Sequence, residues 1–159
     1  MDYVHKAYTL AETFHEGQKY GDLSYVDGHL LPVSLAAKMI AEGLKLSEEQ
    51  IAIVEAVALL HDVIEDTACS LSNIRDIEGC PPEVAAAVWT LTKDEHMTYA
   101  CYLGFVVQGG LYTLIVKLAD SICNYRACLS NGNLQRSLKY SRNIYYLNNA
   151  LEAHIAKQN

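Results

Sequence analysis

The sequence predicts an all-α protein with one compact domain over residues 1–159. Apolar residues recur at helical spacing along almost the whole chain, and alternating runs of β-branched residues are scarce. Glycine, proline and Ser/Asn clusters interrupt this pattern where helices are expected to end. A length of 159 residues is enough for one hydrophobic core and too short for two well-sized domains.

The N-terminal half is predicted to contain three helices. The first covers residues 3–16 and ends before Gly17, and a glycine-containing loop follows it. Pro32 suits the first turn of the second helix. Residues 47–50, Ser-Glu-Glu-Gln, form a capping-box pattern that opens the third. Because residues 51–60 are apolar on nearly every side, we expect this third helix to be the central buried one.

The C-terminal half is predicted to contain five further helices. Ser70 begins a short helix that Gly79 ends. The next four are separated by proline, glycine or asparagine clusters, and they are expected over residues 81–89, 94–108, 111–129 and from 134 to the C-terminus.

The composition argues against several classes of function. The net charge is −7, with 12 basic residues and no basic cluster, so binding to DNA or RNA polymers is not expected. No apolar run is long enough to span a membrane, and the first residues do not resemble a secretory signal. Five cysteines without a C-x-x-C pair indicate buried free thiols in a reducing compartment, and we expect a cytoplasmic protein.

Ionisable residues interrupt the apolar helix that ends near residue 66. His61, Asp62, Glu65 and Asp66 fall within an arc of about 140° if the helix continues through them. Burying such groups without partners costs several kcal/mol each. Their clustering on one side therefore indicates that they converge on a cation.

A second apolar helix carries a polar stripe formed by Thr113, Lys117, Asp120 and Asn124. An adjacent His and Asp on one helix and an Asp on another are suitable metal ligands. A mixed His and carboxylate set with positions left for water suits Mn²⁺ or Fe²⁺ better than a closed structural zinc site.

Simpler interpretations of the same residues remain open. A lone His-Asp dipeptide is a weak signal for a metal. Lys117 and Asp120 could form an ordinary helical ion pair, and Glu65 with Asp66 could be a charge pair at a helix end. His15 could equally pack in the core or face a ligand.

Taken together, these motifs resemble the HD superfamily of metal-dependent phosphohydrolases. The similarity is greatest to the single-domain alarmone, or (p)ppGpp, hydrolases and to the hydrolase domain of Rel/Spo proteins, whose fold is a helical bundle. It rests on motifs that follow one another in the family's order: residues 15–18, Tyr25-Val26, His29, residues 59–67, residues 91–93, and residues 117–120 with Asn124.

The resemblance implies a divalent metal, usually Mn²⁺, with Fe²⁺, Co²⁺ or Mg²⁺ as alternatives. The implied metal ligands are His29, His61, Asp62 and Asp120. Glu65 and Asp66 match the acidic pair that orients or deprotonates the attacking water, and Asn124 matches a residue near the nucleoside. In relatives with this activity the substrate is guanosine tetra- or pentaphosphate, which loses its 3′-pyrophosphate.

The chain departs from the family pattern at two places, one at an expected substrate contact and one beside the implied metal ligand His29. Lys19 and Tyr20 stand where an arginine usually stacks on guanine, and Tyr20 can stack but supplies no cation. The segment before His29 is one residue longer than usual, and Gly28 is expected to absorb this residue in a turn. The expected substrate contacts are Lys19, Tyr20, Lys117 and Asn124. Lys93 is a further candidate for neutralising phosphate charge.

Two other functions remain as alternatives. The chain could be a nucleotide phosphatase or a hydrolase of another small phosphorylated metabolite. It could also be a metal-dependent nucleotide sensor without turnover, although an intact Glu65-Asp66 pair argues against a pure binder. A small phosphorylated nucleotide is the expected partner in each case, and the oligomeric state is not predicted.

Overall fold

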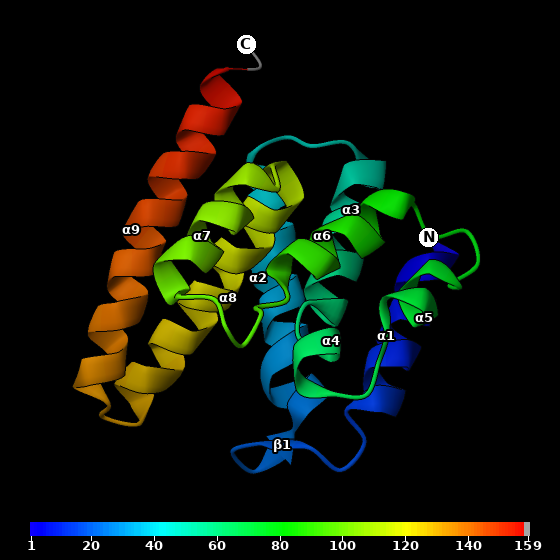
Figure 1. Cartoon of the computed structure of the whole chain (residues 1–159), viewed down its shortest axis with the longest axis horizontal. Helices are drawn as coiled ribbons and strands as arrows, with labels where there is room; N and C mark the ends of the chain where they lie inside the picture. Colours follow the sequence, from blue (N-terminus) through cyan, green and yellow to red (C-terminus); the bar gives the residue numbers. More distant parts are fainter. Residues whose placement is uncertain (158–159) are drawn as a thin grey trace.

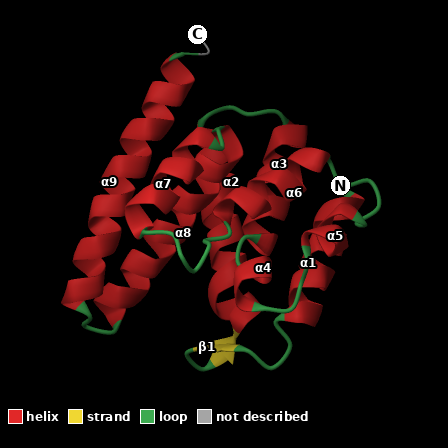
Figure 2. Ribbon diagram, in the orientation of Figure 1, coloured by secondary structure: helices red, strands yellow, loops and turns green. Residues whose placement is uncertain are grey.

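A computed structural model describes residues 1–157 as a bundle of helices with one very small hairpin (Figures 1 and 2). The all-α prediction is confirmed. The elements are α1 (Asp2–Phe14), β1 (Lys19–Tyr20), β2 (Leu23–Ser24), the π-helix η1 (Val26–Leu30), α2 (Leu31–Gly43), α3 (Glu48–Leu60), α4 (Val63–Asp66), α5 (Leu71–Arg75), α6 (Pro82–Leu91), α7 (Tyr99–Gln108), α8 (Leu111–Ser130) and α9 (Leu134–Ala156).

Helix α3 forms the centre of the bundle, as predicted. It contacts α1, α2, α6 and α8, and most of its side chains from Ala52 to Leu60 are buried. Its start is fixed by the expected capping box, in which Ser47 and Gln50 exchange side-chain to backbone hydrogen bonds. A helix held from several sides provides a rigid support for the polar residues that follow its last turn.

Several predicted helix ends were wrong. The backbone leaves the helix at His61 and Asp62, so α4 is a separate single turn rather than a continuation of α3. Helix α7 begins at Tyr99 and not at residue 94, because the Asp94 carboxylate accepts a hydrogen bond from the backbone N–H of His96 and stabilises a local turn instead. The fourth predicted helix ends early, at Arg75, before the turn that contains Gly79.

The segment between α1 and α2 differs most from expectation. It folds back as the β1–β2 hairpin, with Lys19 opposite Ser24, and then enters η1. In η1 the backbone N–H of Leu31 donates to the carbonyl of Val26, five residues earlier. A π-turn holds more residues than an α-turn. Gly28 thus lies inside this widened helical turn, which continues into α2, and not in the separate turn that was expected.

The remaining helices complete one side of the bundle. Helix α9 packs along α8 and forms one edge of the molecule (Figure 1). None of the helices described is both long and apolar enough to cross a membrane. All five cysteines lie within the described residues as free thiols. Only Cys69 and Cys128 are buried and Cys101 is exposed, so the prediction that all are buried was wrong.

Candidate metal centre

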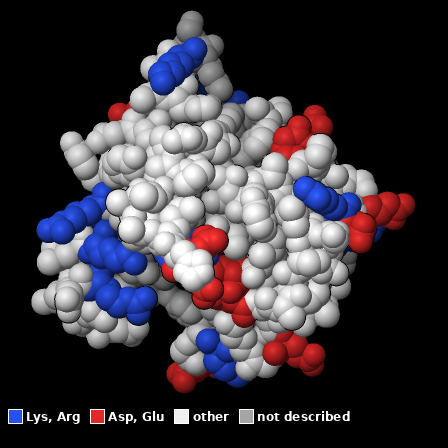
Figure 3. Space-filling model, in the orientation of Figure 1, with Lys and Arg blue, Asp and Glu red and all other residues white. Residues whose placement is uncertain are grey.

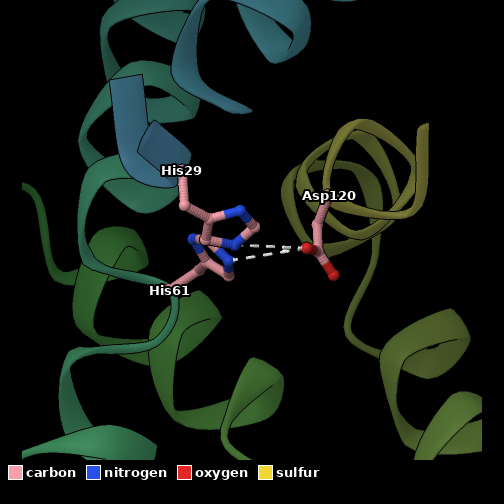
Figure 4. Close-up of side chains that lie close together, drawn as sticks. All are labelled: His29, His61 and Asp120. Carbon is pink, nitrogen blue, oxygen red and sulfur yellow. Dashed lines mark ion pairs between the residues drawn. The ribbon is translucent and has the colours of Figure 1, made fainter. Parts of the chain in front are cut away.

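Three elements bring the candidate ligands together. His29 comes from η1, His61 follows the last residue of α3, and Asp120 lies on α8 (Figure 4). One ligand atom from each of these three buried residues lies within 4.8 Å of the other two. Segments about 90 residues apart in the chain thus converge on one small volume.

The distances between donor atoms suit a single metal ion. Asp62 Oδ2 lies 3.3 Å from His29 Nε2 and 3.0 Å from His61 Nε2. Asp120 Oδ1 lies 3.5 Å and 3.9 Å from the same two nitrogens. Ligand atoms about 2.0–2.2 Å from one ion lie roughly 3–3.5 Å apart. Three of these four distances fall within that range, and the distance from His61 to Asp120 is longer.

The hydrogen bonding of His61 also fits a metal ligand. Its Nδ1 lies 2.8 Å from the carbonyl oxygen of Ala58, so Nδ1–H is the donor and, in the neutral ring, Nε2 carries the lone pair. Nε2 is buried and makes no well-directed hydrogen bond among the described residues, although Asp62 Oδ2 lies 3.0 Å away. Burial opposes a charge on this imidazole, but the carboxylates of Asp62 and Asp120 raise the pKa of His61 to about 9. The site thus favours a positive charge at this point.

Asp120 is oriented by two neighbours on its own helix. Lys117 Nζ lies 2.8 Å from Asp120 Oδ2, and Asn124 donates a hydrogen bond from Nδ2 to Asp120 Oδ1. The polar stripe inferred from spacing on α8 therefore exists. Lys117 forms the helical ion pair that was the simpler interpretation, and its buried ammonium also lies 5.2 Å from the centre of the Tyr102 ring. Its proposed contact with the substrate is not needed to explain its position.

Tyr25 is a functional candidate that the sequence reasoning did not single out. Its hydroxyl donates to Asp62 Oδ2 over 2.7 Å and also lies 3.3 Å from Asp66 Oδ2. Burial and the two carboxylates raise the pKa of the Tyr25 phenol well above its ordinary value, so the hydroxyl remains a donor. The sequence offered one signal, the place of Tyr25-Val26 among the motifs of the family resemblance just before His29.

The acidic pair sits at the rim of this centre. Asp66 faces Tyr25, and burial together with the charge of Asp62 raises the pKa of its carboxyl. Glu65 points toward the segment after α6, where its Oε2 accepts the backbone N–H of Lys93 over 2.8 Å. Both residues are exposed. Asp66 is linked to the centre through Tyr25, whereas the contact of Glu65 is to the backbone of Lys93.

Two of the residues expected to contact substrate, Tyr20 and Asn124, lie beside the candidate ligands His29 and Asp120. The Tyr20 ring stacks on His29 with 5.0 Å between centroids and an angle of 20°, and its hydroxyl lies 3.4 Å from Asn124 Oδ1. Lys19 is exposed on β1. A cavity of about 260 Å³ lies between Tyr20, Asn124 and Arg136. Figure 3 shows acidic groups near the middle of this face and basic side chains along the edge formed by α9.

Comparison with known proteins supports the family resemblance. No protein-family model matches the chain. The GTP pyrophosphokinase rsh of Brucella melitensis is 32% identical over 133 residues, which is 77% of this chain and 16% of that protein. The corresponding proteins of Brucella ovis and Brucella abortus match equally well. The chain therefore spans about a sixth of the length of these relatives.

A solved structure shows the fold independently. It belongs to a metazoan ortholog of SpoT, described as hydrolysing ppGpp, and superposes with a TM-score of 0.70 at 19% identity. The match covers 99% of this chain and 96% of that one. The chain thus has the fold of this SpoT ortholog, and the resemblance to alarmone hydrolases inferred from the motifs is confirmed.

Proposed function

We propose that the chain is a metal-dependent phosphohydrolase that removes the 3′-pyrophosphate from guanosine 3′,5′-bis(diphosphate). The observation that carries this proposal is the convergence of His29, His61 and Asp120 beside an acidic pair at an open rim. The similarity to a ppGpp-hydrolysing SpoT ortholog supports the choice of substrate.

His29, His61, Asp62 and Asp120 would hold the cation, and Mn²⁺ is the first choice for this mixed nitrogen and oxygen set. When bound, a divalent cation lowers the pKa of water and neutralises charge on a phosphate oxygen. The second oxygen of Asp120 stays paired with Lys117, so the α8 side of the centre keeps a fixed orientation.

Glu65 and Asp66 are the groups proposed to accept a proton from the water that attacks phosphorus. Glu65 is anchored through one carboxylate oxygen to the backbone of Lys93, which leaves its other oxygen available. Asp66 is held near the candidate ligand Asp62, because both approach the hydroxyl of Tyr25. Either carboxylate can serve, and Asp66 has the closer link to the centre.

On the substrate side, Tyr20 presents only part of its ring, since one face is stacked on His29. The cavity of about 260 Å³ beside it accommodates one portion of a nucleotide and not the whole molecule. Asn124 and Lys19 are the proposed polar contacts. Because one face of the Tyr20 ring is occupied by His29, a phosphatase acting on a different nucleotide is the second candidate function.

The decisive experiment measures phosphate and pyrophosphate release by the Mn²⁺-loaded protein from guanosine tetraphosphate and from a panel of ordinary nucleotides. We expect pyrophosphate from the tetraphosphate, and loss of this activity in His61→Ala. Activity only on another nucleotide would move the substrate to the second candidate. No release from any phosphoester would overturn the enzymatic proposal.

A variant of the acidic pair separates an enzyme from a sensor. In Glu65→Gln/Asp66→Asn, turnover should fall by roughly 10²- to 10⁴-fold, the usual contribution of a positioned acid or base. Nucleotide affinity, measured by equilibrium binding, should change little because the candidate ligands are intact. A wild-type protein that binds the nucleotide without hydrolysing it would instead be a sensor.

A further inference from the structure

The hydroxyl of Tyr25 occupies a point between two carboxylates with different proposed roles. It lies 2.7 Å from Oδ2 of Asp62, a candidate metal ligand, and 3.3 Å from Oδ2 of Asp66, a candidate base. The same Asp62 oxygen faces His29 and His61. A phenol has one hydrogen to donate, so the shorter contact to Asp62 is the stronger of the two.

The position of this hydroxyl is set by the rest of the side chain. The Tyr25 ring stacks on His15 with 4.7 Å between centroids and an angle of 18°, and its other neighbour His29 lies 5.2 Å away. His15 is itself buried, and its Nδ1 lies 2.6 Å from Gln18 Oε1. The backbone N–H of Tyr25 donates to the carbonyl of Gln18.

These contacts hold Tyr25 through its ring and through its backbone. A side chain held in this way loses little freedom when its hydroxyl donates, so the hydrogen bond orients its acceptors and not the reverse. Supporting groups of this kind determine how a carboxylate presents its lone pairs to a metal. They also keep two like charges at a defined separation.

We propose that Tyr25 is a positioning residue that sets the orientation of Asp62 toward the cation and the placement of Asp66 at the rim. This inference rests on the proposed metal-dependent hydrolysis and adds to it a residue that acts through two others. It also gives a purpose to the His15, Gln18 and Tyr25 cluster, which has no direct access to substrate in the structure.

The test is Tyr25→Phe, which keeps the ring between His15 and His29 and removes only the hydroxyl. We expect Mn²⁺ affinity, measured by competition with a chelating dye, to fall by roughly 10- to 100-fold, as for other supporting residues of metal ligands. With saturating Mn²⁺, kcat should fall while KM for the nucleotide stays within about twofold, because Asp66 is misplaced and the substrate contacts are intact.

The matched control is Ser137→Ala, on α9. The Ser137 hydroxyl is buried and donates one hydrogen bond, over 2.8 Å, to the carbonyl of Leu134. This control should lose similar stability and keep the Mn²⁺ affinity of the wild type. Equal Mn²⁺ affinity in Tyr25→Phe and wild type, or an equal loss in both variants, would overturn the proposal.

The binding measurement keeps this inference separate from the proposed function. If the wild type hydrolyses none of the nucleotides tested but binds Mn²⁺, the comparison of Tyr25→Phe with Ser137→Ala still decides whether Tyr25 positions Asp62. A wild type that binds no Mn²⁺ overturns the metal centre and this inference together.

Discussion

The metal centre has two walls that are built in different ways. One, the α8 wall, consists of Lys117, Asp120 and Asn124 on a single regular helix. The other, the hairpin wall, consists of residues 15–30, which follow α1 and form the β1–β2 hairpin and η1. The α8 wall is organised by charge along one helix, whereas the hairpin wall is organised by shape and ring packing.

The difference decides what each wall tolerates. On α8, helical spacing alone places the Lys117 ammonium and the Asn124 amide against Asp120. A substitution there destabilises the protein mainly by leaving a charge without its partner. In the hairpin wall, Tyr20 and Tyr25 flank His29, and the hairpin approaches η1 closely enough that only glycine fits at position 28. A larger side chain there destabilises the protein because it pushes the closely packed backbone apart.

The largest effect is expected on the α8 wall, from Asp120→Asn. The shape of the side chain is kept, but the buried Lys117 ammonium loses its carboxylate partner. Such a loss costs about 3–5 kcal/mol. Urea unfolding in the presence of a chelator should show this loss in the free energy of unfolding without any contribution from metal binding.

The double variant Asp120→Asn/Lys117→Met is the control for this interpretation. Because it removes the unpaired charge as well, it should recover most of the lost stability. If the double variant were as unstable as Asp120→Asn, charge would not be what organises the α8 wall.

A smaller effect is expected on the hairpin wall, from Gly28→Ala. A Cβ at this position would lie 2.9 Å from both the Cβ and the backbone oxygen of Tyr20, so the hairpin must move away from η1. Overpacking of this kind costs about 1–3 kcal/mol. Since Tyr20 stacks on His29, Mn²⁺ affinity should also fall, by about tenfold.

Gly104→Ala is the matched control, because Gly104 lies within α7 and a Cβ there meets no atom within 4 Å. It should stabilise the protein by about 0.5–1 kcal/mol. Equal behaviour of the two glycine variants in thermal unfolding and Mn²⁺ titration would show that the hairpin wall does not depend on close approach.

The same contrast explains which features could be predicted from the sequence. The α8 stripe and the capping box at Ser47 depend on local spacing, and both were predicted correctly. The break at His61 and Asp62, the π-turn of η1 and the role of Tyr25 depend on contacts between distant segments. A single sequence shows that such segments contain polar residues, but not which of them meet.

The smallest effect is expected from Tyr20→Phe, and it separates the ring of Tyr20 from its hydroxyl. The hydroxyl is 3.4 Å from Asn124 Oδ1, a long contact, so its removal should cost about 0.5 kcal/mol or less. Mn²⁺ affinity should stay within about twofold, since the ring still stacks on His29.

Tyr20→Leu provides the contrast, because it also removes the stacked ring and should cost a further 0.5–1.5 kcal/mol or so. Mn²⁺ titration of both variants then shows which part of Tyr20 supports His29. If the two variants bound Mn²⁺ equally well, the stacked ring would be dispensable to the ligand. Tyr20 would then belong to the substrate cavity alone, and the hairpin wall would depend on Gly28 and Tyr25 for its shape.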